Sequence, residues 1–221
     1  MFIGHLALGF AAKRAAPRVS LAMLMLAAQW ADTIWPVLVA FGLEQVRIDP
    51  GNTVFTPLDF VSYPYSHSLV ALVLWGLAVG SAYRGIAGGR RTVLVLGALV
   101  VSHWLLDVVS HRPDMPIYPG GPKVGLGLWN HVAATVIVET IMFATGLWIY
   151  LRATRARDAV GRWAVWSLVA ILVVAYAANA LAGAPPSVDA IWMGALAGAA
   201  ALTALAWWAD AHRDAAPALP R

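Results

Sequence analysis

The stretch RTVLVLGALVVSHWLLDVVSHR, residues 91–112, indicates both the fold class and the chemistry of this chain. At ~1.5 Å per residue, a helix of this length can cross the ~30 Å hydrocarbon core of a bilayer. Its interior is apolar except for a few polar residues, among them His103 and Asp107. These two residues are four positions apart, so they share one face of a helix and can bind one ion together. The stretch therefore predicts a membrane-crossing helix that carries part of a polar site.

The rest of the chain has the composition of a membrane protein with several spans. Of 221 residues, 61% are hydrophobic and 12% are charged, and the mean hydropathy is +0.72. Soluble proteins are about half apolar and a quarter charged, so an ordinary soluble domain and a disordered chain are both excluded. Six segments are predicted to cross the membrane: 19–43, 64–83, 91–112, 128–151, 163–183 and 188–208. A shorter apolar segment, Phe2 to Ala12, is long enough for only about half a bilayer. We expect an all-α membrane bundle of about six spans, preceded by a short N-terminal half-helix.

The positive charges are distributed unevenly along this predicted bundle. Twelve of the fifteen Lys and Arg residues fall in turns on one side, and only Arg47, Arg112 and Lys123 fall on the other. The positive-inside rule then places the basic turns and the C-terminus in the cytoplasm. The net charge of +4 is explained by this topology, and we expect no nucleic-acid partner.

Titratable side chains on four segments are predicted to lie at similar depths. Besides His103 and Asp107, these are His5, Asp32 and His67. Such groups are expensive within a bilayer and are usually functional when a partner is present. The chain has no cysteine, so any metal must be held by His, Asp or Glu. A hydrogen-bonded His103–Asp107 pair that only links two helices is the alternative.

Three imidazoles and two carboxylates favour Zn²⁺, Mn²⁺ or Fe²⁺ over Ca²⁺ and Mg²⁺. Five ligands exceed the need of one closed tetrahedral ion. The surplus favours either two metals bridged by a carboxylate or one metal with a spare carboxylate that acts as a base.

Four further residues are weaker candidates. Glu139 can be a general base, a ligand or a hydrogen-bond anchor to another helix. His111 can be a second-metal ligand or an interfacial histidine. Tyr65 and Arg112 lie where the outer loops meet the predicted site, so they are candidates for substrate binding, and a guanidinium suits a phosphate oxygen. An arginine at the level of the lipid headgroups is the alternative for Arg112.

We treat residues 1–221 as a single membrane domain with two regions. Residues 1–152 carry all the candidate ligands and form the predicted metal-site bundle. Residues 163–208 have acidic groups only at their ends or in loops, so they are predicted to be a C-terminal helical hairpin that serves as scaffold.

Four short motifs carry a resemblance to a known family: Gly4-His5, Ala31-Asp32, Ser66-His67-Ser68, and Ser102-His103 through Asp107. Their order and spacing resemble the YdjM-like inner-membrane proteins, which are described as metal-dependent hydrolases. This chain has Ile34 where that family has a second aspartate, and Ser62-Tyr63-Pro64 where it has His-Arg-Gly. The order of ligands is also similar, more distantly, to that of zinc-dependent phospholipase C.

The resemblance implies a metal-dependent hydrolase of a bacterial inner membrane that acts on a phosphoester or another lipid-like substrate. One or two Zn²⁺ ions would activate a water, and Asp32 or Glu139 would accept its proton. A lipid amidase or esterase is the alternative among enzymes. A metal or proton transporter and a protein with a purely structural metal are the alternatives outside that class.

Overall fold

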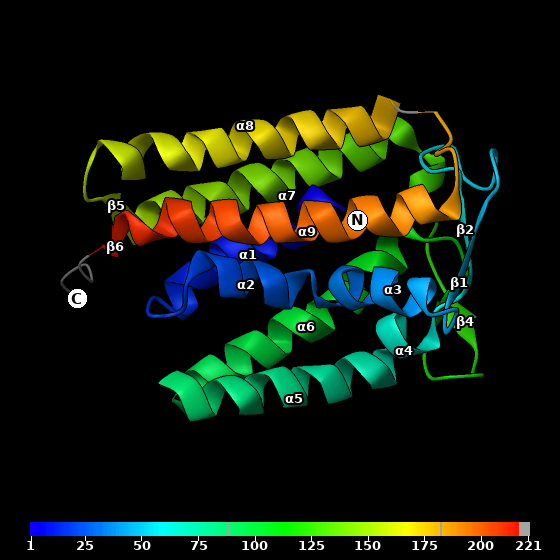
Figure 1. Cartoon of the computed structure of the whole chain (residues 1–221), viewed down its shortest axis with the longest axis horizontal. Coiled ribbons are helices and arrows are strands. Elements are labelled where there is room, and N and C mark those ends of the chain that lie inside the picture. Colours follow the sequence, from blue (N-terminus) through cyan, green and yellow to red (C-terminus); the bar gives the residue numbers. More distant parts are fainter. Residues whose placement is uncertain (88, 182, 217–221) are drawn as a thin grey trace.

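In the computed structural model, the stretch quoted above forms the helix α6, Arg90–Ser110, within a bundle of helices (Figure 1). The structure describes residues 1–87, 89–181 and 183–216. Its other elements are α1 Ile3–Ala15, α2 Leu21–Ala28, α3 Trp30–Ala40, β1 Gln45–Ile48, β2 Leu58–Ser62, α4 Pro64–His67, α5 Leu69–Ala87, β3 Met115–Pro116, β4 Lys123–Val124, the 3₁₀ turn η1 Leu128–Asn130, α7 Val132–Ala153, β5 Thr154–Ala156, α8 Ala159–Leu181, α9 Val188–Ala211 and β6 Arg213–Ala215. The strands form three antiparallel pairs, β1–β2, β3–β4 and β5–β6, at the ends of the bundle.

The chain is a helical membrane protein. Within the described residues, α6, α7, α8 and α9 are long and apolar enough to cross a membrane. The count becomes five if α2 and α3, which meet at an angle of 61°, are taken as one bent span. The six spans expected from the sequence are therefore not confirmed.

Two of the expected spans are interrupted in the structure. The expected span 19–43 is interrupted at Gln29, where α2 ends and α3 begins. The expected span 64–83 is divided because Pro64 starts the single turn α4, and Ser68 is then extended with φ −76° and ψ 147°. Helix α5 therefore begins only at Leu69, and its apolar part is shorter than the four long helices.

Helix α1 lies inside the bundle and is buried on most of its faces. It is too short to cross a bilayer, as expected for a half-helix, and it packs against α7, α2 and α6. A helix that is apolar all round belongs in a core. The approach to α7 is close because Gly146 has no side chain. A Cβ at that position would lie 2.2 Å from the carbonyl oxygen of Ala7. This packing fixes the place of His5, which lies in the first turn of α1.

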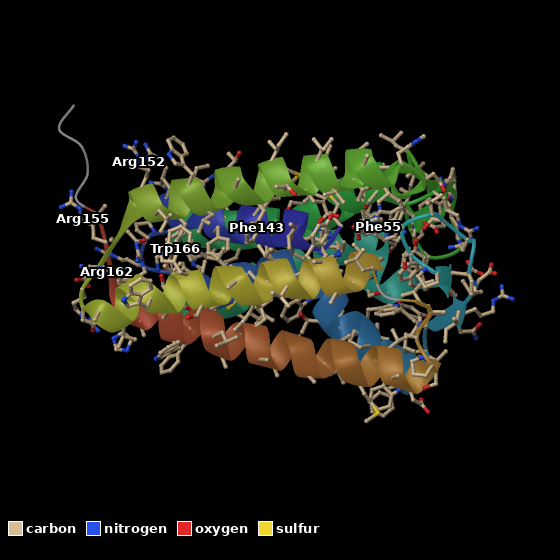
Figure 2. All side chains as sticks on the ribbon, turned by 90° about the horizontal axis from the view of Figure 1, so that it is seen from above. Phe55, Phe143, Arg152, Arg155, Arg162 and Trp166 are labelled. Atoms are coloured by element: carbon tan, nitrogen blue, oxygen red, sulfur yellow. The ribbon has the colours of Figure 1, made fainter. Side chains whose placement is uncertain are left out.

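The two ends of the bundle differ in charge. The turns α1–α2, α5–α6 and α7–α8 lie at one end, together with β5 and β6, and the β1–β2 and β3–β4 pairs lie at the other (Figure 1). Arg152, Arg155 and Arg162 gather at the first end, and Phe55 lies toward the opposite end (Figure 2). We call the first end the basic end.

Lys13 is one of the twelve basic residues that the sequence assigns to this side. Its side chain is buried, and Nζ donates to Asp210 Oδ2 at 2.5 Å and to the carbonyl of Val19 at 2.9 Å. Asp210 also accepts from the Tyr150 hydroxyl and from the Leu21 amide, each at 2.9 Å. This network joins α1, α2, α7 and α9 at the basic end.

Candidate metal centre

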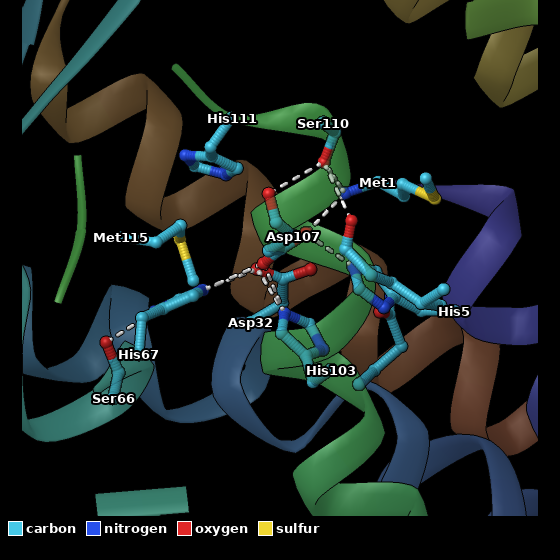
Figure 3. A network of polar contacts seen from close by, with 12 residues as sticks. Met1, His5, Asp32, Ser66, His67, His103, Asp107, Ser110, His111 and Met115 are labelled. Carbon is cyan, nitrogen blue, oxygen red and sulfur yellow. Dashed lines mark hydrogen bonds and ion pairs between the residues drawn. The ribbon is translucent and has the colours of Figure 1, made fainter. Parts of the chain in front are cut away.

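Five of the predicted site residues converge in one cluster (Figure 3). They come from four helices that are distant in sequence. The five are His5 from α1, Asp32 from α3, His67 from α4, and His103 and Asp107 from α6. Their ligand atoms form two overlapping groups, His5–His103–Asp107 and Asp32–His67–His103, in each of which all atoms lie within 4.8 Å of one another.

Four of these residues form a compact set of donors. His103 Nε2 lies 3.1 Å from Asp107 Oδ2 and 3.7 Å from Asp32 Oδ1. His67 Nε2 lies 3.4 Å from Asp32 Oδ1 and 3.9 Å from Asp107 Oδ2. Ligands bound tetrahedrally to zinc at 2.0–2.1 Å are about 3.3 Å apart, so the spacing of these atoms is close to that of a metal site.

The break between α2 and α3 serves this arrangement in two ways. Ala28 is the last residue of α2, so its carbonyl has no partner within the helix and accepts from His103 Nδ1 at 2.8 Å. Asp32 lies in the first turn of α3, where the helix dipole favours a negative charge. A continuous helix would provide neither feature.

In His103 and His67, the ring nitrogen that points away from the cluster, Nδ1, is hydrogen-bonded to another protein group. The bond to Ala28 makes Nδ1 the protonated nitrogen of His103 and leaves Nε2 as a lone-pair donor. Ser66 Oγ donates to Glu44 Oε2 at 2.5 Å and is therefore free to accept from His67 Nδ1 at 2.7 Å. Both rings are thereby held with Nε2 toward the centre, as is usual for histidines that bind a metal.

Glu44, which was not among the residues predicted from the sequence, contacts the site through Ser66. Its side chain is buried, and it directly precedes β1 in the chain. Its Oε1 accepts from the backbone amides of Tyr65 and Ser66 at 2.7 and 2.9 Å. The chain has only two glutamates, Glu44 and Glu139, and this rarity in so apolar a sequence was an available signal.

We expect Glu44→Ala to weaken metal binding through His67. Loss of an outer partner of this kind lowers metal affinity by about 10–100-fold. Competition titration of the purified protein against a chromogenic chelator measures the change. Asp49→Ala is the matched control, because it removes an exposed carboxylate of the same loop region. Equal affinities for both variants would show that Glu44 does not position His67.

Within the residues that the structure describes, His5 lacks the hydrogen bond at Nδ1 that His67 and His103 have. Its ring stacks on that of His103 with 3.7 Å between centroids and 4° between planes, and Nε2 lies 2.9 Å from Asp107 Oδ1. The buried Nδ1 has no hydrogen-bond partner in the described part of the chain. The amino nitrogen of Met1 also contacts Asp107 Oδ1, at 2.5 Å, and Ser110 Oγ at 3.2 Å. His5 is thus placed to act as an additional ligand beside the set of four.

The chemistry of the site fits a divalent transition metal. Among the described residues, the buried Nε2 of His103 has no hydrogen-bond partner, although it faces two carboxylates. Two to three neutral imidazoles with two carboxylates and no thiolate are a donor set that Zn²⁺ or Mn²⁺ accepts.

Glu139 lies beside this cluster, where it holds the start of α1. Its Oε2 accepts from the backbone amides of Phe2 and Gly4 at 2.8 and 3.0 Å. This is the anchoring role, one of the three that the sequence left open. It is not among the residues of the two ligand groups.

The structure places the loop candidates in a separate polar network. His111 Nδ1 lies 3.0 Å from Asp114 Oδ1, and Arg112 binds Asp59 Oδ1 at 2.5 Å and Asp114 Oδ2 at 3.3 Å. Burial favours the neutral acid, but hydrogen bonds from His111, Tyr63 and Arg112 keep the pKa of Asp114 below its usual value. His111 is not part of the two ligand groups, and the guanidinium of Arg112 is already paired.

Tyr65 differs from these residues because its side chain is exposed. Its contribution to the site is through the backbone, since its amide donates to Glu44 and its carbonyl accepts from the Trp75 indole at 3.0 Å.

Asp32 is the one residue of the set that faces open space. Its side chain is 41% exposed, whereas those of His5, His67, His103 and Asp107 are 4% exposed or less. It lines a cavity of ≈ 670 Å³ between the α2–α3 break and the helices α8 and α9. The expected scaffold hairpin therefore also forms a wall next to the site.

No protein family, curated protein or solved structure matches this chain. The resemblance to the YdjM-like proteins therefore stays a prediction.

Proposed function

We propose that this membrane protein is a metal-dependent hydrolase whose substrate is a phosphoester or another lipid-like molecule. The observation that carries the proposal is the asymmetry of the donor cluster: four of its side chains are enclosed, and Asp32 alone opens into a large cavity. Structural metal sites are closed by protein ligands, whereas catalytic sites keep one side open for water or substrate.

His67, His103, Asp32 and Asp107 would hold the ion, with His5 as a further ligand. A bound Zn²⁺ or Mn²⁺ would supply Lewis acidity toward a phosphoryl or carbonyl oxygen and would make water a better nucleophile at neutral pH. Ala28 and the Ser66–Glu44 pair would keep the two imidazoles in the required tautomer and orientation.

Asp32 is the carboxylate best placed to accept a proton from the attacking water. A general base must be within hydrogen-bond reach of the reacting group, and Asp32 is the carboxylate of the cluster that lines the cavity. Glu139, the other carboxylate considered from the sequence, already binds two backbone amides through Oε2.

We further propose that the basic end faces the cytoplasm of a bacterial inner membrane and that the site opens toward the outer leaflet. Twelve of the fifteen Lys and Arg residues support this orientation by the positive-inside rule. The partner is then a membrane lipid or a lipid-linked molecule.

The test compares two carboxylate variants on a panel of lipid phosphoesters, esters and amides. Asp32→Asn should lower turnover by about 10²–10⁴-fold, the usual contribution of a general base. Glu139→Gln is the matched control and should stay within a few-fold of wild type, because the amide oxygen can still accept from Phe2 and Gly4. A metal-loaded wild-type protein that hydrolyses none of these lipids would overturn the proposal.

A further inference from the structure

The cavity beside Asp32 has walls of two different kinds. At the α2–α3 break it is lined by Gln29, Asp32, Thr33 and Trp35. On α8 and α9 it is lined mostly by aliphatic and small residues, including Leu172, Ala175, Ala195, Gly198 and Leu202. A space with one polar end and one apolar wall suits an amphiphile.

The polar end contains hydrogen-bonding groups that the described residues leave unused. Trp35 is only 6% exposed, and its Nε1 has no hydrogen-bond partner there. The same holds for Oε1 of Gln29, one turn before Asp32. Buried polar groups are nearly always paired, so these two point to a polar ligand group next to the metal cluster.

The apolar wall opens to the outside between α8 and α9. Ile171, Asn179, Gly194 and Gly198 line the cavity and are also exposed. Within the described residues, nothing lies within 4 Å of the place that a Cβ of Gly194 or Gly198 would take. Both helices are long and apolar enough to cross the membrane, so the medium at this opening is hydrocarbon.

We propose that this cavity binds one hydrocarbon chain of a membrane lipid, which enters between α8 and α9 and carries its polar head to Asp32, Trp35 and Gln29. The statement about the head rests on the proposed function, whereas the statement about the chain rests on the cavity alone. A volume of ≈ 670 Å³ lies within the range of about 300–1,000 Å³ typical of small-molecule sites. Gly194 and Gly198 keep the wall open and thereby determine which chains fit.

Shape decides the selectivity of such a site. A lipid tail leaves one apolar medium for another when it enters the cavity, so hydrophobic transfer gives little gain. The fit of the chain to the wall determines binding, and a larger side chain on the wall should exclude it.

Photolabelling tests this inference without requiring turnover. The probe is a long-chain alkyl phosphonate, which has no hydrolysable ester bond, with a diazirine on its terminal carbon. We expect it to label the cavity-facing residues of α8 and α9 in the metal-loaded protein. Gly198→Leu should reduce this labelling by about tenfold or more, because its side chain would occupy the space that the lipid chain needs, with metal content unchanged.

Ala197→Leu is the matched control, because Ala197 is exposed on the same helix and does not line the cavity. It should label like wild type. Labelling of the cavity without hydrolysis of any lipid would support the chain site and refute the hydrolase. Hydrolysis with no labelling of the cavity, or equal labelling of both leucine variants, would overturn the chain site. A disulfide between two copies of Gly198→Cys, in a chain without native cysteine, would show that a second copy occupies this face and would likewise overturn it.

Discussion

His103→Ala is expected to abolish high-affinity binding of divalent metal. His103 belongs to both ligand groups, and its ring stacks on His5, so its loss disturbs the whole cluster. Wild-type protein purified without chelators should hold about one or two equivalents of zinc or manganese. The variant should hold almost none, as measured by elemental analysis.

A second readout separates loss of metal from loss of fold. Zinc at about one hundred times its Kd should stabilise wild type by ~2.7 kcal/mol, seen as a rise in Tm, and should not stabilise the variant. Ser102→Ala is the matched control, because the Ser102 hydroxyl donates only to Leu99 of its own helix. A His103→Ala protein that keeps its metal would refute the ligand set.

Asp210→Ala is expected to give the largest loss of stability away from the site. Asp210 accepts from Lys13 at 2.5 Å, and also from Tyr150 and Leu21. Removal of one partner leaves the Lys13 ammonium buried without its counter-ion, and such a change lowers the free energy of unfolding by about 3–5 kcal/mol. Thermal or denaturant unfolding in detergent measures the effect.

Asp214→Ala is the control for this variant, since Asp214 is an exposed carboxylate on β6. Its effect should remain within ~0.5 kcal/mol of wild type. Lys13→Met combined with Asp210→Leu should recover part of the stability, because an apolar pair can replace a buried ion pair. If Asp210→Ala unfolds like Asp214→Ala, the network does not hold the basic end together.

The fold class could be predicted from the sequence because long apolar segments have few alternatives. The helices α6, α7, α8 and α9 lie within a few residues of the expected spans. The expected spans 19–43 and 64–83 were less accurate, because hydropathy does not show where a helix breaks. The interruption at Ser68 follows the local turn that Pro64 starts, whereas Gln29 is neither a proline nor a glycine and gives no breaking signal.

The five central site residues could be proposed because titratable groups are rare and expensive at bilayer depth. Spacing could not reveal the partners that orient them. The Ala28 carbonyl carries no sequence signal, and Glu44 lies outside the expected spans, where no ligand was sought. The buried ion pair of Lys13 could not be predicted for a similar reason, because its partner Asp210 lies 197 residues away in the chain.

The cavity could not be predicted from the sequence either. In the sequence, Gly194 and Gly198 resemble part of a small-residue face on a scaffold helix. Such faces commonly pack against another helix. In the structure they line open space next to Asp32. That placement depends on how α9 lies against α2, α3 and α8, which no local pattern encodes.

X-ray absorption spectroscopy of the zinc-loaded wild-type protein reports directly on the proposed ligands. We expect only nitrogen and oxygen ligands, with scattering from two or three imidazoles. These ligands are His67, His103 and His5 together with the carboxylates of Asp32 and Asp107. A folded protein that binds no zinc, or binds it without imidazole ligands, would refute this metal centre.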